Sequence, residues 1–345
     1  MNSYERMMLA LNHEIPDTVP IFEILGDHLH QQVCPEKSLL DMYEMIDVDG
    51  LWVCEDQLNW ETVTPTIKRD HFGVLRDFHV TEGATFPFPY EPLIPTDADL
   101  NQFLENYRLP DPLEKGRLQS LEEMVKRFKG KKAIVFAVWS SFIYPSFLRG
   151  FENYLLDYYD NPEFVLEINH RFSKYYERQI YAAAEIGADC IMESEDFCGK
   201  TGPFMSKELF EKFCMPGLKI VSEATHKAGL KFIKHSDGYT WPILDSLITG
   251  LQSDAYHPSE PIAGMDIHQV KERFGKETCV IGNIDCSHLL PYGTEEEIEM
   301  AVKKCMDENK EGGGYILSSS NCIHAAIPYK NLQAMIRAGR LYGKY

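Results

Sequence analysis

A histidine and an aspartate, two positions apart, end the apolar run LKFIKHSDGYTW at residues 230–241. Side chains of a strand alternate between its two faces, so a strand here places Ile233, His235 and Asp237 together on one face. Burying two polar side chains beside Gly238 is costly unless they have partners. Since a His-x-Asp pair at a strand end can supply two ligands to one ion, we expect a metal-binding or proton-transferring site here.

Polar residues also end the other apolar runs of the C-terminal half. They are Glu193, Glu195 and Asp196; His257 and Glu260; Asn283, Asp285 and Cys286; and Asn321, Cys322 and His324. Imidazole, carboxylate and thiol groups form a mixed donor set, which suits zinc better than magnesium or calcium. Structural roles compete with this interpretation, because Glu193 and Glu195 fit a solvated or paired strand end equally well. His257, before Pro258, fits a turn better than a ligand, and a single cysteine is more often a core residue.

The elements that would position these residues alternate between strands and helices. We predict strands at 17–25, 49–56, 131–141, 188–196, 230–235, 252–257, 278–285 and 314–320, and helices at 3–12, 120–130, 150–159, 161–186, 206–228, 241–249, 266–274, 294–310 and 328–341. This alternation predicts a parallel sheet with crossover helices. Eight strands without a GxGxxG motif favour an α/β fold of the (β/α)8 TIM barrel type over an open sheet. Chemistry in such a barrel lies at the C-terminal ends of the strands, where the polar residues above collect.

The whole chain, residues 1–345, is expected to form one such barrel domain. Within it, residues 57–115 are rich in proline, aspartate and aromatic residues, with little periodicity. We expect an irregular excursion that covers a binding cleft. Its aromatic side chains Phe86, Phe88 and Tyr90 are expected to line the pocket and exclude water.

The composition excludes several classes of protein. With 53 acidic and 34 basic residues, the net charge of −19 argues against a nucleic-acid or anionic-membrane partner. No apolar stretch is long enough to span a membrane, and the N-terminus lacks the basic and apolar regions of a signal peptide. Nine cysteines without a CxxC pair argue against a disulfide framework. We therefore expect a soluble, cytoplasmic enzyme.

Five segments of the C-terminal half resemble a known family. They are GADCIMESEDFCGKTGPFMSKELFEKFCMPGLKIV (187–221), KHSDGYTWPILDSLI (234–248), SDAYHPSEPIAGMDI (253–267), FGKETCVIGNIDC (274–286) and GGGYILSSSNCIHAAIPYKNLQAMI (312–336). In this order they resemble the uroporphyrinogen decarboxylase superfamily, which includes the decarboxylase of haem biosynthesis and zinc methyltransferases that work with corrinoid proteins. The resemblance implies a (β/α)8 barrel, in agreement with the strand count, and a homodimer as in many members.

The N-terminal segment separates the two branches of this superfamily. The decarboxylase binds the carboxylates of its substrate with an arginine-rich segment of the type RQAGRY. The matching segment here, VPIFEILGDHLHQQ, has no arginine, and none occurs between Arg6 and Lys37. A substrate with eight carboxylates would meet acidic residues instead, so the methyltransferase branch is the expected one.

The methyltransferase branch also implies a ligand set. It carries His-x-Cys at the fifth strand end, a carboxylate at the sixth and a cysteine at the eighth. By this resemblance the metal ligands are His235, Asp237, Glu260 and Cys322. Asp237 stands where the branch has a cysteine, and Cys286 is a substitute ligand.

The activity implied is that of a demethylase component. It moves a methyl group from a small methylated substrate, such as an aryl methyl ether, to a corrinoid protein, with zinc as Lewis acid. The corrinoid is carried by a separate partner, because the chain shows no second domain to hold one. Glu193, Glu195 and Asp196 are the catalytic candidates, which orient substrate or move a proton. The alternatives are a metal-independent decarboxylase of a smaller acid and a binding barrel without catalysis.

Overall fold

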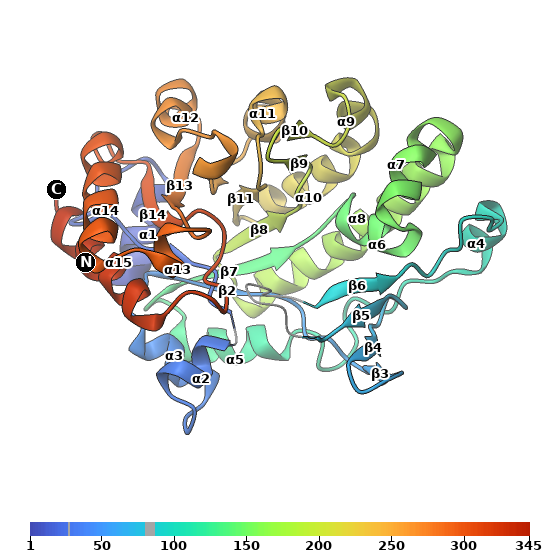
Figure 1. Ribbon diagram of the computed structural model, residues 1–345, viewed down its shortest axis with the longest axis horizontal. Helices are drawn as coiled ribbons and strands as arrows, with labels where there is room; N and C mark the ends of the chain where they lie inside the picture. The colour runs from blue at the N-terminus through green and yellow to red at the C-terminus, as the bar shows by residue number, and fades with distance from the viewer. Residues whose placement is uncertain (27, 80–86) are drawn as a thin grey trace.

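The computed structural model describes residues 1–26, 28–79 and 87–345 of the chain. Its centre is an eight-stranded parallel sheet in the order β1-β2-β7-β8-β11-β12-β13-β14 (Figure 1). The strands are β1 (Phe22–Glu23), β2 (Gly50–Val53), β7 (Ala133–Val138), β8 (Cys190–Ser194), β11 (Lys231–His235), β12 (Ala255–His257), β13 (Cys279–Ile284) and β14 (Tyr315–Ser319). The first and last strands meet through hydrogen bonds of 2.9 Å from Leu317 N to Pro20 O and from Ile323 N to Ile24 O. The predicted (β/α)8 TIM barrel is therefore confirmed.

Helices connect the strands and surround the barrel (Figure 1). They are α1 (Ser3–Leu11), α2 (His28–Val33), α3 (Leu39–Met45), α5 (Gln119–Phe128), α6 (Ile143–Arg149), α7 (Phe151–Asp160), α8 (Pro162–Ile186), α9 (Lys207–Phe213), α10 (Met215–Lys227), α11 (Leu244–Ile248), α12 (Ile267–Phe274), α13 (Leu289–Tyr292), α14 (Glu295–Asn309) and α15 (Tyr329–Tyr342), with short 3₁₀ helices η1 (Trp241–Ile243) and η2 (Pro261–Ala263). The helix predicted at 206–228 is two helices that meet at Cys214, because Pro216 lacks an N–H and suits the first turn of a new helix. Within the described ranges, no helix is long and apolar enough to cross a membrane.

The strand side chains form two separate apolar layers. Those that point into the barrel include Phe22, Ala133, Val135, Cys190, Met192, Ile233, Ala255, Ile281 and Ile316, which pack with one another and with α1. Those that point outward pack under the helices and include Ile134, Phe136, Ile191, Phe232, Tyr256, Val280 and Leu317. Because the two sets alternate along each strand, the layer in which a polar side chain lies follows from its position.

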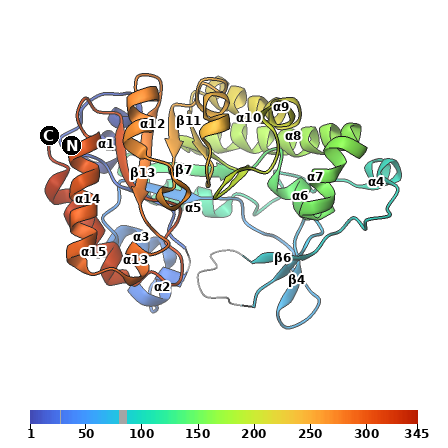
Figure 2. The same ribbon diagram turned by 45° about the horizontal axis from the view of Figure 1, so that its top comes forward.

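The described parts of residues 57–115 are more regular than the predicted irregular excursion. They contain an antiparallel sheet of β3 (Glu61–Thr62), β4 (Ile67–Arg69), β5 (Leu75–Asp77) and β6 (Phe88–Glu91), followed by α4 (Leu100–Asn106). Figure 2 shows this small sheet set beneath α6 and α7, to one side of the barrel. A buried ion pair stabilises this small sheet: Nε of Arg76 on β5 lies 2.9 Å from Oδ2 of Asp70.

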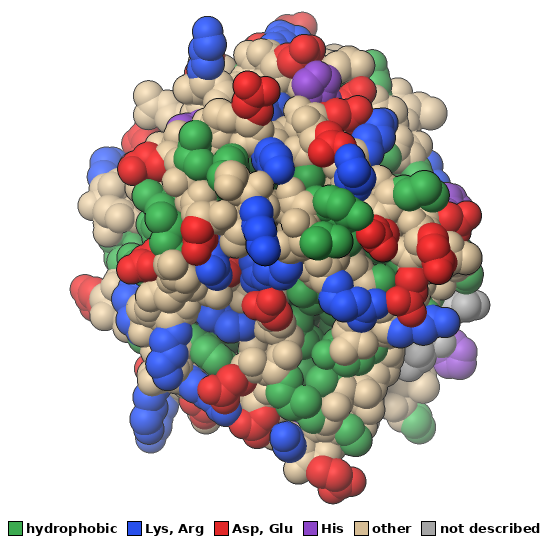
Figure 3. All heavy atoms as spheres, turned by 90° about the vertical axis from the view of Figure 1, so that its left-hand side faces the viewer, with side chains coloured by type: hydrophobic (Ala, Val, Ile, Leu, Met, Phe, Trp, Pro, Cys, Tyr) green, Lys and Arg blue, Asp and Glu red, His purple; other side chains and the backbone are tan. Residues whose placement is uncertain are grey.

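The face formed by α14 and α15 carries charges of both signs. Basic and acidic side chains are interspersed over it in the space-filling view (Figure 3). Ion pairs join Arg337 to Glu295 at 2.6 Å and Arg340 to Asp47 at 2.9 Å. Side chains of opposite charge on this face therefore lie close enough to pair.

Candidate metal centre at the mouth of the barrel

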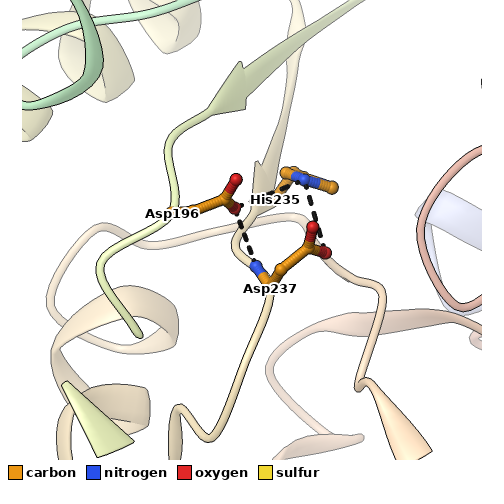
Figure 4. A group of neighbouring side chains, drawn as sticks. All are labelled: Asp196, His235 and Asp237. Atoms are coloured by element: carbon orange, nitrogen blue, oxygen red, sulfur yellow. Dashed lines mark hydrogen bonds and ion pairs between the residues drawn. The ribbon is translucent and has the colours of Figure 1, made fainter. Parts of the chain in front are cut away.

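Three side chains that can bind a metal converge at the C-terminal ends of β8 and β11. Asp196, His235 and Asp237 each offer a ligand atom, and these atoms lie within 4.8 Å of one another (Figure 4). Nε2 of His235 lies 3.6 Å from Oδ1 of Asp196 and 3.6 Å from Oδ1 of Asp237. Since β8 and β11 are paired neighbours in the sheet, their ends bring the three residues together.

The charge state of this group favours a cation. Burial lowers the pKa of His235 to about 3, so its ring is neutral and has a lone pair to donate. Burial raises the pKa of Asp237 well above its ordinary value, and the charges of Asp196 and Glu260 raise it further. Burial also raises the pKa of Asp196. A bound cation would relieve this excess of negative charge.

The hydrogen bonds leave a ligand atom without a partner. Oδ2 of Asp237 accepts a hydrogen bond from Nδ2 of Asn321, whereas Oδ1 is buried and has no hydrogen-bond partner among the described residues. The Asp196 side chain is 38% exposed, so one edge of the group faces solvent. Three protein ligands beside an open edge are typical of catalytic zinc sites. The residues therefore fit a zinc ion, with one nitrogen and two carboxylate ligands.

The ligand set differs from the one predicted from the sequence. His235 and Asp237 are brought together as expected, but the third member is Asp196, which was predicted to be catalytic. Glu260 and Cys322 lie outside the group of ligand atoms, although Glu260 is near: its Oε2 accepts a hydrogen bond of 2.9 Å from the Gly238 amide. Cys322 is partly buried and packs against the interior layer of the barrel.

Cys286 also lies outside the group of ligand atoms. Its Sγ lies 3.4 Å from Oγ of Ser320. Burial raises the pKa of Cys286 to about 12, so its side chain is a thiol rather than a thiolate at neutral pH. The role of Cys286 as a substitute ligand stays a prediction.

Glu193 and Glu195 do not line the mouth of the barrel. Cys190 and Met192 point inward, so Glu193 points outward, where its Oε2 pairs with Nζ of Lys234 at 2.5 Å. Both side chains of this pair are fully buried. The structure thus places Glu193 on the outer face of the barrel wall, and its catalytic role stays a prediction.

Glu195 lies next to this pair and is also fully buried. Its Oε1 accepts a hydrogen bond of 2.9 Å from the Ser140 amide. Burial, together with the charge of Glu193, raises the pKa of Glu195 to about 8. Like Glu193, it connects the ends of β7 and β8 instead of facing the group of ligand atoms.

His257, which was expected to fit a turn better than a ligand, lies beside the centre. It ends strand β12 rather than forming a turn, and it is fully buried. In the sheet it is paired with His235, and the Nδ1 atoms of the two rings are 2.7 Å apart. The signal was present in the alternation of Ala255 and His257, which places His257 inside the barrel.

A cavity of about 620 Å³ opens at the same end of the barrel, beyond β1 and β2. Its walls are largely apolar and include Ile24, Leu25, Leu39, Leu40, Trp52, Val53, Phe78, Pro87 and Met124, with Glu55 and Asp56 among the polar residues. Of the aromatic residues predicted to line a pocket, Phe86 lies outside the described residues, and Tyr90 is 58% exposed. Another cavity, of about 660 Å³, lies between α5 and α8.

Comparison with known proteins agrees with this fold. A methyltransferase from Methanosarcina mazei has a TM-score of 0.77 with 20% sequence identity, and the match covers 99% of each chain. A candidate vitamin-B12 independent methionine synthase from Listeria monocytogenes has a TM-score of 0.47 with 12% identity, and the match covers 96% of this chain and 99% of the other. No curated protein matches the chain significantly. The sequence model of the uroporphyrinogen decarboxylase (URO-D) family matches residues 70–342, which include the whole candidate centre, and the chain therefore belongs to this family.

Proposed function

We propose that the protein is a zinc-dependent methyltransferase, the demethylase component of a corrinoid-linked system. It takes a methyl group from a small methylated substrate, such as an aryl methyl ether, and passes it to a corrinoid protein. The observation that carries this proposal is the group of Asp196, His235 and Asp237 at the mouth of a barrel of this family. The relative from Methanosarcina mazei, which shares the fold over its full length, is itself named a methyltransferase.

The residues of the centre have distinct tasks in this proposal. His235 donates the lone pair of Nε2, and Asp196 and Asp237 supply carboxylate oxygens. Bound there, zinc supplies a Lewis acid to the heteroatom that carries the methyl group. Asp196, at the exposed edge of the group, is placed to orient the substrate. Burial raises the pKa of Glu260. A carboxyl with a raised pKa is suited to donate a proton to the oxygen of the demethylated product.

The end of the barrel that carries the centre suits a neutral substrate with an apolar body. Apolar and aromatic side chains such as Leu25, Trp52 and Phe78 line the cavity of about 620 Å³, a volume within the usual range for small-molecule sites. The carboxyls of Asp237 and Glu260 lie close enough for their charges to interact. The nearby cation Lys234 forms an ion pair with Glu193 on the outer face of the barrel wall. A substrate with many carboxylates would therefore be repelled.

The alternative is a metal-independent carboxy-lyase that acts on a smaller acid. One observation favours it: Asp237, with its raised pKa, could hold a proton at neutral pH and donate it to a carbanion. In that case the proton on Asp237, rather than a cation, would relieve the excess of negative charge.

A paired assay separates the two functions. Zinc-loaded and chelator-treated protein would be mixed with aryl methyl ethers and cob(I)alamin, and methylcobalamin would be followed by its visible spectrum. The same preparations would be tested for release of carbon dioxide from small carboxylic acids. We expect methylcobalamin only from the zinc-loaded protein, none from His235→Ala, and parental rates from His170→Ala, which changes an exposed histidine of α8. Full activity without zinc, or release of carbon dioxide, would favour the lyase.

A further inference from the structure

His235 and His257 form a stacked pair inside the barrel. Their ring centroids are 4.9 Å apart with 24° between the ring planes, and the two Nδ1 atoms are 2.7 Å apart. His257 is fully buried, and His235 is 6% exposed. The edge of the His257 ring contacts Phe22 on β1, with 6.1 Å between centroids at 86°. The pair is therefore held in one orientation by the wall of the barrel.

The short distance between the Nδ1 atoms leaves room for a single hydrogen. Either His235 donates to His257, or His257 donates to His235. Burial disfavours charge on both rings, so each ring carries one N–H and the position of the shared hydrogen decides the tautomer of both. Nε2 of His257 lies 3.3 Å from Oγ of Ser318, which can accept from it or donate to it.

The two arrangements differ at the metal centre. When His235 carries its hydrogen on Nδ1 and donates it to His257, Nε2 of His235 is bare and faces Asp196 and Asp237. When His257 is the donor, His235 presents an N–H to those carboxylates at 3.6 Å, longer than a normal hydrogen bond. Only the first arrangement offers a lone pair to a cation.

We infer that His257 is a positioning residue, which accepts the Nδ1 hydrogen of His235 and so keeps Nε2 of His235 bare for a divalent metal ion. Ser318 completes the chain by accepting the Nε2 hydrogen of His257. This inference rests on the metal centre of the proposed function. In metalloproteins generally, the partner of a ligating histidine fixes the tautomer and the orientation of the ring.

Zinc affinity in matched variants tests the inference. His257→Phe keeps a flat ring in the stack and removes the acceptor, whereas His257→Asn can place its amide oxygen near the position of Nδ1. In a competition assay with a chromophoric chelator, we expect His257→Phe to weaken zinc binding by about 10- to 100-fold, the usual effect of such partners. His257→Asn should stay within a few-fold of the parent. If the parent protein binds no zinc, the proposed metal centre itself is overturned. If the parent and His257→Phe bind zinc with equal affinity, only the role of His257 is overturned.

A spectroscopic measurement on the unmodified, zinc-free chain needs no variant. Long-range ¹H–¹⁵N NMR correlations of the imidazoles distinguish a protonated ring nitrogen from a bare one. We expect His235 to be protonated at Nδ1 and bare at Nε2, and His257 to be protonated at Nε2. The opposite assignment, with His235 protonated at Nε2, would overturn the inference even if His257→Phe fails to fold.

Discussion

The carboxylate of Asp196 accepts a hydrogen bond of 2.9 Å from the backbone amide of Asp237. This contact ties the end of β8 to the end of β11 and keeps two acidic side chains together in spite of their repulsion. Nε2 of His235 lies at 3.6 Å from both carboxylates. The backbone therefore holds these groups together. Burial raises the pKa of both acids, and the charge of Asp196 adds to the rise at Asp237.

Asp237→Asn should therefore have opposite effects on stability and on metal binding. Removal of one buried carboxylate relieves the repulsion, so we expect a higher melting temperature for the zinc-free variant at neutral pH. The same change removes a charged ligand, so zinc should raise that temperature much less than it does in the parent. Thermal unfolding with chelator and with added zinc measures both effects. A zinc-free variant less stable than the parent would contradict this explanation.

Asp196→Asn and Glu260→Gln should separate the ligand set in the structure from the one expected by resemblance. Asp196 belongs to the group of ligand atoms, and Glu260 does not. We expect Asp196→Asn to lose bound zinc on dialysis, whereas Glu260→Gln keeps it, because a glutamine oxygen can still accept from the Gly238 amide. Metal analysis by mass spectrometry gives the zinc content per chain. The reverse outcome would support the ligand set expected by resemblance.

Glu193→Gln should reduce stability and leave zinc affinity within a few-fold of the parent. Glu193 neutralises Lys234 inside the protein, and removal of one partner of a buried ion pair costs about 3–5 kcal/mol. Denaturant unfolding measures the loss. The double variant Glu193→Leu/Lys234→Met serves as the control, since it leaves no uncompensated charge and should regain most of the stability. Unchanged stability together with lost methyl transfer would support a catalytic role for Glu193.

Glu23 should make the protein less stable as the pH rises. It is buried on β1, where it accepts hydrogen bonds from the amide and the hydroxyl of Ser319 at 2.5 and 2.7 Å. Burial raises the pKa of Glu23 from 4.5 to about 8. The folded protein therefore keeps a proton that the unfolded chain releases, and the free energy of unfolding falls between these two pH values.

Glu23→Gln mimics the protonated form, so it should match the parent near pH 5 and exceed it in stability above pH 8. Denaturant unfolding across this range measures the difference, and the exposed Glu14→Gln is the control. Parallel curves for the parent and Glu23→Gln would show that Glu23 titrates normally.

The sequence was sufficient to predict the barrel, because each apolar strand and its amphipathic helix form a repeating unit with one favourable packing arrangement. It did not reveal the sheet of β3 to β6, since strands of two to four residues are too short to display a period. The single helix predicted at 206–228 was wrong because the effect of Pro216 on the helix was overlooked.

The candidate site was predicted in part. His235 and Asp237 were predicted to lie together because side chains two positions apart on a strand share one face. The same alternation on β8, where Cys190 and Met192 point inward, places Glu193 on the outer face. The sequence favoured a turn at His257 because β12 has only three residues before a proline. The pairing of His257 with His235 is a tertiary contact between two strands.

X-ray absorption spectroscopy of the zinc-loaded protein tests the central claim most directly, namely that a metal ion binds among Asp196, His235 and Asp237. Nitrogen and oxygen ligands lie about 2.0–2.2 Å from zinc, whereas a thiolate sulfur lies about 2.3 Å away and scatters more strongly. We predict one zinc per chain with nitrogen and oxygen neighbours and no sulfur. A sulfur neighbour that disappears in Cys322→Ser, or a protein that retains no zinc, would contradict this account.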